Sequence, residues 1–474
     1  LVFTMKGSFK PGDLVFNIEP YAVVVNSGHR LTRCDHCLSE GERKCSACKA
    51  IVYCSRDCQK AAWRLHHKLE CRCLSNHRPN VPSESGRLFL KLLFRSVGAI
   101  GIGDDHEGAV WRDSAGLRLF KDLMSHVDEL RADEARMLAF GELCQSIRVF
   151  TAGVINADSF PSGDSLLELF GRMVINAFSV PDSFGVQIGT AICLSASVLD
   201  HSCQPNVHAY FQSGKLLVKC LTNVNRFDQL RINYCSLMYT WKQRRETLLS
   251  QYYFECNCSL CSEYLMQNSS EPDELKCSKT ACQGVCTAVV DGSTQAVTGH
   301  SVCELCASQP ASLDPSLIQS WRNQLQLELA NKSDTSNNSD SNVVNRRKAL
   351  LSNQENPLHP QHKLCAQLFD SLYSNCLSKS DWTEAQKIGE EILLPARKRH
   401  LGSLLWQQHD SGLLLYELGR LANNQMQLRQ ALGRFEQAES IFNLTVESDA
   451  PALLSLRYQI IKTKSEILAV EQSG

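Results

Sequence analysis

The 474-residue sequence predicts an α+β protein in which a β-rich domain carries an inserted zinc finger and is followed by a helical lobe. Three observations support this class. Cysteines gather in metal-like groups between residues 34 and 71 and again from residue 256 to residue 306. Residues 1–25 alternate between apolar and polar side chains, with turn signals at Pro11-Gly12 and Glu19-Pro20, which predicts a small β-hairpin. Residues 360–470 show the apolar spacing of helices.

Length and composition exclude several classes of protein. A chain of 474 residues is long enough for two or three domains. The net charge of −1 and the pI near 7.0 give no strong nucleic-acid signal. The sequence contains no run of 18 apolar residues, so we expect no membrane span. The 23 cysteines form metal-like groups, which favours a reducing compartment, and we expect a cytoplasmic and nuclear protein. Because Leu1 already lies in an apolar run, we also expect further residues before it.

The most informative segment runs from Cys34 to Cys71 and contains seven cysteines and a histidine in the spacing C-x2-C-x7-C-x2-C-x5-C-x3-C-x8-H-x3-C. Eight ligands are enough for two tetrahedral zinc sites. We expect residues 57–71 to be helical, which places His67 and Cys71 on one face. His66 is the alternative ligand to His67. A disulfide cluster is the competing interpretation, but paired C-x2-C runs favour metal.

Two further cysteine groups follow. Cys203, Cys256, Cys258 and Cys261 predict a third zinc site, with buried, unliganded cysteines as the alternative. We accept that alternative for Cys193, Cys220 and Cys235. The fourth group, in the spacing C-x4-C-x20-C-x2-C, is similar to a zinc ribbon and consists of Cys277, Cys282, Cys303 and Cys306. Cys286 could replace Cys282, and a loop with free cysteines is the competing interpretation.

The segment 34–71 resembles a MYND finger, chiefly in its YCSRDCQ and HKLEC runs. In that family the ligand pairs interleave. The resemblance therefore implies one zinc site made of Cys34, Cys37, Cys54 and Cys58, and a second made of Cys45, Cys48, His67 and Cys71. MYND fingers bind partner peptides or support a neighbouring domain. Their closed sites leave no open position for a substrate.

Three downstream motifs resemble a SET domain: DHSCQPN at 200–206, RINY at 231–234 and CNCSLC at 256–261. Their order after a MYND finger resembles that of the SMYD lysine methyltransferases over nearly the whole chain. The resemblance implies the following division: N-terminal part of SET 1–33, MYND finger 34–71, helical SET insertion 72–170, core SET 171–237, post-SET zinc region 238–264, zinc ribbon 272–310, partly disordered linker 311–359 and TPR-like domain 360–474.

By this resemblance the protein is an S-adenosylmethionine-dependent protein-lysine N-methyltransferase. Methyl transfer requires a neutral, desolvated lysine amine aligned with the sulfonium, so positioning supplies much of the acceleration. An aromatic channel favours loss of the amine's proton and holds the cationic stem. The resemblance makes Tyr234, Phe178 and Tyr252 the catalytic and channel residues, with the Tyr234 hydroxyl orienting the amine. The competing interpretation of Tyr234 is a strand tyrosine in the core.

The cofactor residues implied by the resemblance come from several segments. Asn176 contacts the methionine moiety, His201 presents backbone groups to the adenine and Phe254 stacks on that ring. His126 reaches the cofactor from the helical insertion. The remaining contacts come from Ser197, Leu199, Asp200 and Tyr234. Each of these residues has a structural alternative as a capping or core side chain.

Three departures from the family pattern support a second hypothesis, a catalytically inactive zinc adaptor or transcriptional co-regulator. The family's glycine-containing cofactor loop is absent from the sequence. Asp200 stands where an asparagine is usual. Phe-Asp-Gln-Leu at 227–230 replaces a Gly-Glu-Glu-Leu type of turn.

The sequence and the resemblance also suggest partners. They are a protein substrate with a target lysine, partner peptides at the finger, and a chaperone or regulator at the TPR-like lobe. In that lobe, close helix approach is allowed by the small residues Gly419, Ala422, Ala431 and Ala438. Residues 332–357 are rich in Ser, Asn and Asp and are expected to be flexible and solvated.

Overall fold

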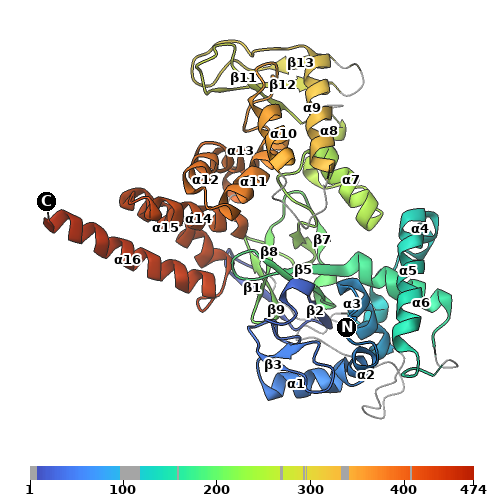
Figure 1. Ribbon diagram of the computed structural model, residues 1–474. Helices are drawn as coiled ribbons and strands as arrows, with labels where there is room; N and C mark the ends of the chain where they lie inside the picture. The colour runs from blue at the N-terminus through green and yellow to red at the C-terminus, as the bar shows by residue number, and fades with distance from the viewer. Residues whose placement is uncertain are drawn as a thin grey trace. The chain divides into compact units, whose positions relative to one another are not determined.

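The computed structural model describes residues 8–96, 118–156, 160–266, 271–291, 294, 296–331, 341–405 and 408–473. The chain divides into two compact units, whose elements are labelled in Figure 1. Unit 1 comprises Leu1–Asp200, Val207–Leu230 and Gln251–Tyr253, and unit 2 comprises His201–Asn206, Arg231–Ser250 and Phe254–Gly474. Among the described residues, no helix has the length and apolar character needed to span a membrane.

Two three-stranded antiparallel sheets form the β-structure of unit 1. The first has the order β1-β9-β8, with β1 at Leu14–Ile18, β9 at Lys215–Cys220 and β8 at Val207–Gln212. The second has the order β2-β6-β5, with β2 at Ala22–Val25, β6 at Gln187–Ile192 and β5 at Ala177–Pro181. β8 and β9 are joined by Ser213-Gly214, both with positive φ, as a type I′ hairpin turn requires.

The two N-terminal strands do not form the hairpin that the sequence predicted. β1 pairs with β9 and β2 pairs with β6, so the two strands belong to different sheets. Pro20, in the short link between them, has no N–H with which to continue a ladder. All four residues of β2 are buried, whereas β1 alternates between buried and exposed positions. The hairpin prediction was wrong because each strand pairs with a strand distant in the sequence.

The helices of unit 1 include the finger helix and the helical segment that follows it. α1, the π-helical turn η2 and α2 form one continuous helical run, which confirms the expectation for residues 57–71. The helices are α1 (Arg56–Ala62), η2 (Trp63–His67), α2 (Lys68–Asn76), α3 (Glu84–Ser96), α4 (Val127–Ala132), α5 (Glu134–Thr151) and α6 (Gly163–Asn176). The short elements are β3 (Arg43–Lys44), β4 (Val52–Tyr53), η1 (Ser27–His29), η3 (Phe120–Asp122), η5 (Ser195–Val198) and η6 (Phe227–Gln229).

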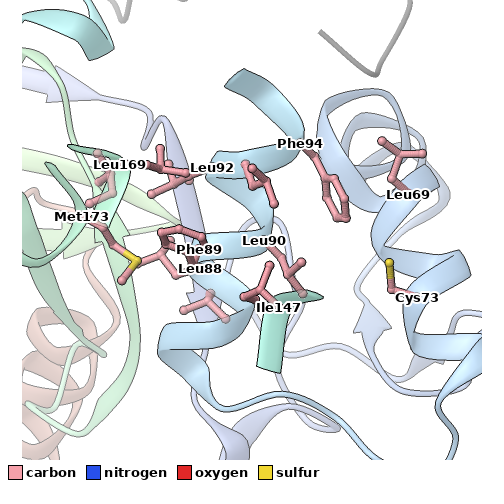
Figure 2. Packing of buried hydrophobic residues seen from close by; sticks show 14 of the residues in the cluster. Leu69, Cys73, Leu88, Phe89, Leu90, Leu92, Phe94, Ile147, Leu169 and Met173 are labelled. Carbon is pink, nitrogen blue, oxygen red and sulfur yellow. The ribbon is translucent and has the colours of Figure 1, made fainter. Parts of the chain in front are cut away.

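Helix α3 lies in the middle of the apolar core of unit 1. Six of its apolar side chains are almost fully buried: Leu88, Phe89, Leu90, Leu92, Leu93 and Phe94. Figure 2 labels all of these except Leu93, with Leu69 and Cys73 of α2 on one side and Leu169 and Met173 of α6 on the other. The helices within residues 72–170 therefore pack around one apolar core.

Unit 2 combines a small antiparallel sheet with a helical lobe. The sheet has the order β11-β12-β13, at Asp273–Lys276, Val285–Val290 and Val297–His300. β7 (Asp200–His201) lies where the two units divide, and β10 spans Arg231–Ile232. The helices are α7 (Trp241–Tyr252), which ends in unit 1, α8 (Ser259–Met266), α9 (Pro315–Ala330), α10 (Ser341–Ser352), α11 (Lys363–Ser378), α12 (Trp382–Ile388), the π-helical η7 (Gly389–Leu393), α13 (Leu394–Leu405), α14 (His409–Asn424), α15 (Leu428–Thr445) and α16 (Pro451–Ser473).

Small residues allow α14 and α15 to pack closely. A Cβ at Gly419 would overlap the ring of Phe435 on α15. Ala422, Ala431 and Ala438 are fully buried. The short link between the two helices makes them an antiparallel helical hairpin. This confirms the expected role of the small residues.

Part of the segment expected to be flexible is helical. Residues 341–352 form α10, and Leu351 is buried. Glu328 of α9 accepts hydrogen bonds from Arg346 and also pairs with Arg347. The ion pairs and the burial of Leu351 stabilise the packing of this polar segment, which its composition alone did not predict. Residues 332–340 lie outside the described residues.

Candidate metal centres and aromatic site

Two sets of four ligands come together in the finger. The ligand atoms of Cys34, Cys37, Cys54 and Cys58 lie within 4.8 Å of one another, and so do those of Cys45, Cys48, His67 and Cys71. The pairs interleave as the family resemblance implied. The Sγ atoms of Cys37 and Cys54 are 3.4 Å apart, and those of Cys45 and Cys71 are 3.8 Å apart.

These distances fit zinc and exclude disulfides. Two sulfurs bound tetrahedrally at about 2.3 Å from zinc lie about 3.8 Å apart, whereas a disulfide holds them at about 2.05 Å. None of the 23 cysteines forms a disulfide. The disulfide interpretation was therefore wrong.

A tight turn brings together the two sulfurs of each C-x2-C pair in the finger. The Leu38 amide donates to the Cys34 carbonyl and the Lys49 amide to the Cys45 carbonyl, at 3.0 and 2.9 Å. Both donors have positive φ, which folds each C-x2-C segment back on itself. A hydrogen bond with Cys34 lowers the pKa of Cys37 to about 4, so this sulfur favours the thiolate form that binds metal.

The two downstream groups also converge. Cys203, Cys256, Cys258 and Cys261 form the third set, and Cys277, Cys282, Cys303 and Cys306 form the fourth. The Sγ–Sγ distance is 3.7 Å from Cys203 to Cys261 and 3.6 Å from Cys282 to Cys303. The amide of Gly284 donates to the Cys282 sulfur at 3.4 Å. Four zinc-compatible sets are thus present in the described chain.

The remaining cysteines with alternative interpretations are buried away from these sets. Cys286 lies in β12 and is not part of the fourth set, so Cys282 takes that position. Cys193, Cys220 and Cys235 are buried and belong to no candidate metal group among the described residues. This agrees with the interpretation of these three as core cysteines.

A cluster of three rings stands next to the third set in unit 2. The ring centroids of His201 and Tyr234 are 5.4 Å apart, those of His201 and Phe254 are 6.2 Å apart, and those of Tyr234 and Phe254 are 6.3 Å apart. Tyr234 follows β10 rather than lying within it and is half-buried. The sequence therefore predicted residues that the structure brings together.

His201 links this ring cluster to the metal ligands. Its Nδ1 accepts a hydrogen bond from the Tyr234 amide at 3.0 Å. In a neutral imidazole, Nε2 then carries the proton. Nε2 lies 3.4 Å from the Cys203 sulfur and is placed to donate to it. One imidazole thus connects the backbone of Tyr234 to a sulfur of the third set.

Asn176 of unit 1 holds the loop that carries His126. The Asn176 side-chain amide donates to the carbonyls of Met124 and Arg172, each at 2.9 Å. These bonds use both of its N–H groups and leave Oδ1 as an acceptor, which fits the ammonium group of a bound S-adenosylmethionine. His126 has a left-handed backbone with φ of 49° and pairs with Glu129 at 3.2 Å.

The other predicted residues of unit 1 have distinct surroundings. Ser197 donates to the Leu194 carbonyl and accepts from Arg118. Leu199 is buried, whereas Asp200 is exposed. Tyr252 lines a cavity of about 660 Å³ together with Ala177 and Ser179 of β5. Phe178 lies between those two residues, and the alternation of the strand puts it on the opposite face.

Sequence reasoning missed Tyr253. Its hydroxyl donates to Asp133 at 3.2 Å, and its ring lies 5.6 Å from that of His126. Arg136 stacks on the same ring at 5.3 Å. The aromatic run 252–254 was visible in the sequence. The sequence did not reveal that Tyr253 has a positive φ, unlike Tyr252 and Phe254, or that its ring therefore lies against His126.

Asp35, His66 and Glu70 form a further buried group with metal-like spacing. Arg87 and Lys91 already neutralise both carboxylates. Burial lowers the pKa of His66 to about 4, so it adds no charge at neutral pH. The group is therefore an ion-pair cluster, and His67 rather than His66 joins the second metal set.

Comparisons with known proteins identify one family model and several similar proteins. The MYND finger family model matches residues 34–71. Histone-lysine N-methyltransferase SMYD3 of Homo sapiens is 33% identical over 255 residues, which cover 53% of this chain and 56% of that protein. Histone-lysine N-methyltransferase ASHR1 of Arabidopsis thaliana is 27% identical over 299 residues, 60% of this chain and 58% of that protein. N-lysine methyltransferase SMYD2 of Homo sapiens is 29% identical over 257 residues, 54% of this chain and 56% of that protein.

The chain therefore spans little more than half the length of the curated relatives it matches. The finger match falls on the eight residues that the structure gathers into the first two ligand sets. The chain therefore contains a MYND finger at residues 34–71 and is similar to the SMYD lysine methyltransferases over about half of its length.

Proposed function

We propose that this protein is an S-adenosylmethionine-dependent protein-lysine N-methyltransferase acting on histone or non-histone substrates. The observation that carries the proposal is the His201–Tyr234–Phe254 ring cluster, tied through His201 to the third metal set. The relatives named as lysine methyltransferases support the same activity.

The residues have separate roles in this proposal. S-adenosylmethionine supplies the methyl group. Phe254 stacks on the adenine, and Asn176 Oδ1 accepts from the ammonium group, as Asp200 also does. His126, Ser197, Leu199 and His201 complete the cofactor contacts, the last three with backbone groups.

We assign Tyr234, Phe178 and Tyr252 to the target lysine on the family resemblance. Tyr234 stands in the ring cluster, where its ring excludes water from the amine and favours the neutral form of the amine. The Tyr234 hydroxyl accepts a hydrogen bond from the amine and keeps its lone pair in line with the methyl carbon. The His201 hydrogen bond to the Tyr234 amide fixes the backbone that carries this hydroxyl.

A large cavity in unit 2 suits the protein substrate. It has a volume of about 1140 Å³ and is lined by Asn233 and residues 236–239, which flank Tyr234 in the chain. Helices α9, α11 and α14 supply other parts of its wall, through Asn323, Gln367 and Ser411. We propose that the segment carrying the target lysine binds here.

We propose the remaining assignments on the same basis. The domain limits are those implied by the family resemblance, with a SET domain, a post-SET zinc region and a TPR-like lobe. Zinc fills all four ligand sets. Partner peptides bind the finger, a chaperone or regulator binds the lobe, and the protein works in cytoplasm and nucleus.

One observation favours the second candidate function, a zinc adaptor without transferase activity. In the turn at 227–230, Asp228 is paired with Arg226 at 2.5 Å, and Phe227 packs against Phe16. The family's turn has two glutamates, whereas this turn has a single carboxylate, and that carboxylate is already paired with Arg226. An adaptor would retain the metal sets while lacking methyl transfer.

Tyr234→Phe tests the proposed transferase. The variant loses one hydroxyl and little volume, so fold and S-adenosylmethionine affinity should stay the same. Methyl transfer should fall by about two to three orders of magnitude, as happens when one oriented polar group is removed elsewhere. Tyr264→Phe, on α8, is the matched control and should transfer at the wild-type rate. Full activity in Tyr234→Phe would rule out the role given to its hydroxyl.

A further inference from the structure

Helix α3 carries three cations, Arg87, Lys91 and Arg95, spaced four residues apart. This spacing places them on one face of the helix. Arg87 and Lys91 are at most 1% exposed, and Arg95 is half-buried. We call these three residues the cation row. Burying a charge is costly unless it is paired, so the partners of these cations show which segments the row connects.

Arg87 contacts both ligand segments of the finger. Its Nη2 donates to Asp35 Oδ1 at 2.8 Å and to Glu70 Oε1 at 2.7 Å, and its Nε donates to Glu70 Oε1 at 3.0 Å. Asp35 follows Cys34, a ligand of the first set, and Glu70 precedes Cys71, a ligand of the second. One buried guanidinium is therefore shared by the two metal sites.

Glu70 also orients the histidine ligand. Its Oε2 lies 3.1 Å from Nδ1 of His67, while Nε2 of His67 faces the sulfurs of Cys45 and Cys48 at 3.4 and 3.8 Å. A proton held on Nδ1 by a carboxylate leaves Nε2 free to bind metal.

The cation row continues from the finger to strand β2. Lys91 Nζ donates to Asp35 Oδ2 at 2.9 Å and to the Val23 carbonyl at 2.7 Å. Arg95 donates to the Tyr21 carbonyl and lies 4.0 Å from the centre of the Tyr21 ring. The two carboxylates and the two fully buried cations balance in charge.

We propose that Arg87 is a positioning residue that couples the two finger metal sites to each other, and that Lys91 extends this coupling to strand β2. When either site loses its metal, its ligand segment loosens and moves Asp35 or Glu70. Arg87 is then left buried with one partner fewer, which weakens its hold on the other segment. Coupling of this kind is reciprocal between the sites.

The test follows both sites separately while metal is withdrawn. The zinc-loaded chain is titrated with a chelator, and amide hydrogen exchange is measured in peptides that cover residues 34–38 and 66–71. In the wild type we expect both peptides to lose protection at one chelator concentration. In Arg87→Met the two midpoints should separate roughly tenfold, within the range of about 5–150-fold typical of coupled sites. Arg72→Met removes an exposed arginine of α2 and should behave as the wild type.

Two further variants keep the test decisive. Lys91→Met should speed exchange in residues 21–25 of the metal-loaded chain. If Arg87→Met fails to fold, Arg87→Lys keeps the charge without the fork that reaches both carboxylates, and its midpoints should separate by a smaller factor. One shared midpoint in the Arg87 variants would mean that the interleaved ligand order alone couples the sites, and would overturn the proposal. None of these measurements depends on methyl transfer.

Discussion

Gly171, Arg172 and Asn176 of helix α6 all act on the loop at residues 121–126. Arg172 donates to the carbonyls of Lys121 and Leu123, and Asn176 donates to that of Met124. Gly171 lacks a Cβ and so allows the Ser125 carbonyl to approach the helix. The loop ends at His126, whose left-handed backbone costs about 1–3 kcal/mol unless its surroundings hold it. The hydrogen bonds from α6 stabilise this backbone conformation.

Gly171→Ala tests this contact. The new Cβ would overlap the Ser125 carbonyl, so the loop must shift. We expect the free energy of unfolding to fall by about 1–3 kcal/mol, and S-adenosylmethionine affinity to fall as His126 is displaced. Thermal unfolding and titration calorimetry measure the two effects. Gly163→Ala, at the start of the same helix, places its Cβ in open space and is the control. Equal stability and affinity in the two variants would contradict this view of the loop.

The ligand sets show what an element's sequence can reveal. Cysteines two to four residues apart are brought together by one turn, so spacing predicted which neighbouring cysteines share a site in the finger, and the family resemblance implied how the pairs interleave. The third set was predicted from its four cysteines, but no single turn can bring Cys203 to Cys256–Cys261, and the fold supplies that contact. The competition between Cys282 and Cys286 was settled only by the structure, because strand β12 carries Cys286 away from the set.

Zinc content follows from these elements. We expect elemental analysis to find about four zinc ions per chain, because each tetrad closes one tetrahedral site. Cys282→Ser should lower the content to about three. Cys286→Ser, four residues further on, should leave it at four. Equal loss in both variants, or a wild-type content near zero in a folded chain, would refute the assignment of the sets.

Strand partners and local packing were less predictable. The alternation of residues 14–25 identified two strands but not their partners, because β9 and β6 lie about 200 and 170 residues away in the chain. Residues 341–352 looked solvated, yet Glu328 pairs with Arg346 and Arg347 there. Tyr253 was missed because its turn depends on a single positive φ. Each of these features depends on a contact distant in the sequence or on a single backbone angle, and local composition predicts neither.

The whole molecule consists of two units with different tasks in this account. Unit 1 holds the finger, the cation row of α3 and the loop at 121–126. Unit 2 holds the ring cluster, the third and fourth metal sets and the helical lobe. In unit 2, β11 carries buried acidic residues against the start of α11. Asp273 pairs with His362 at 3.1 Å, while Glu274 lies 3.8 Å from His400.

Stability of unit 2 should depend on pH through Glu274. Burial raises the pKa of Glu274 from about 4.5 to about 7. The folded state therefore binds one more proton than the unfolded state between these values, and the stability from this group is lost as pH rises through 7. Glu274→Gln should raise the thermal midpoint at pH 8 and change it little at pH 4.5. Glu304→Gln, which breaks the pair with Arg399, should lower the midpoint at pH 8. A lower midpoint for Glu274→Gln at pH 8 would contradict the burial argument.

Methyl transfer by the full-length protein tests the central claim most directly. The protein is incubated with S-adenosylmethionine labelled in its methyl group and with a pool of histone and cytosolic proteins, and the labelled product is hydrolysed to amino acids. We predict label in methylated lysine, with transfer reduced by about two to three orders of magnitude in Tyr234→Phe. No label in lysine from any pool, in a protein that retains its zinc, would contradict the transferase and leave the adaptor as the function.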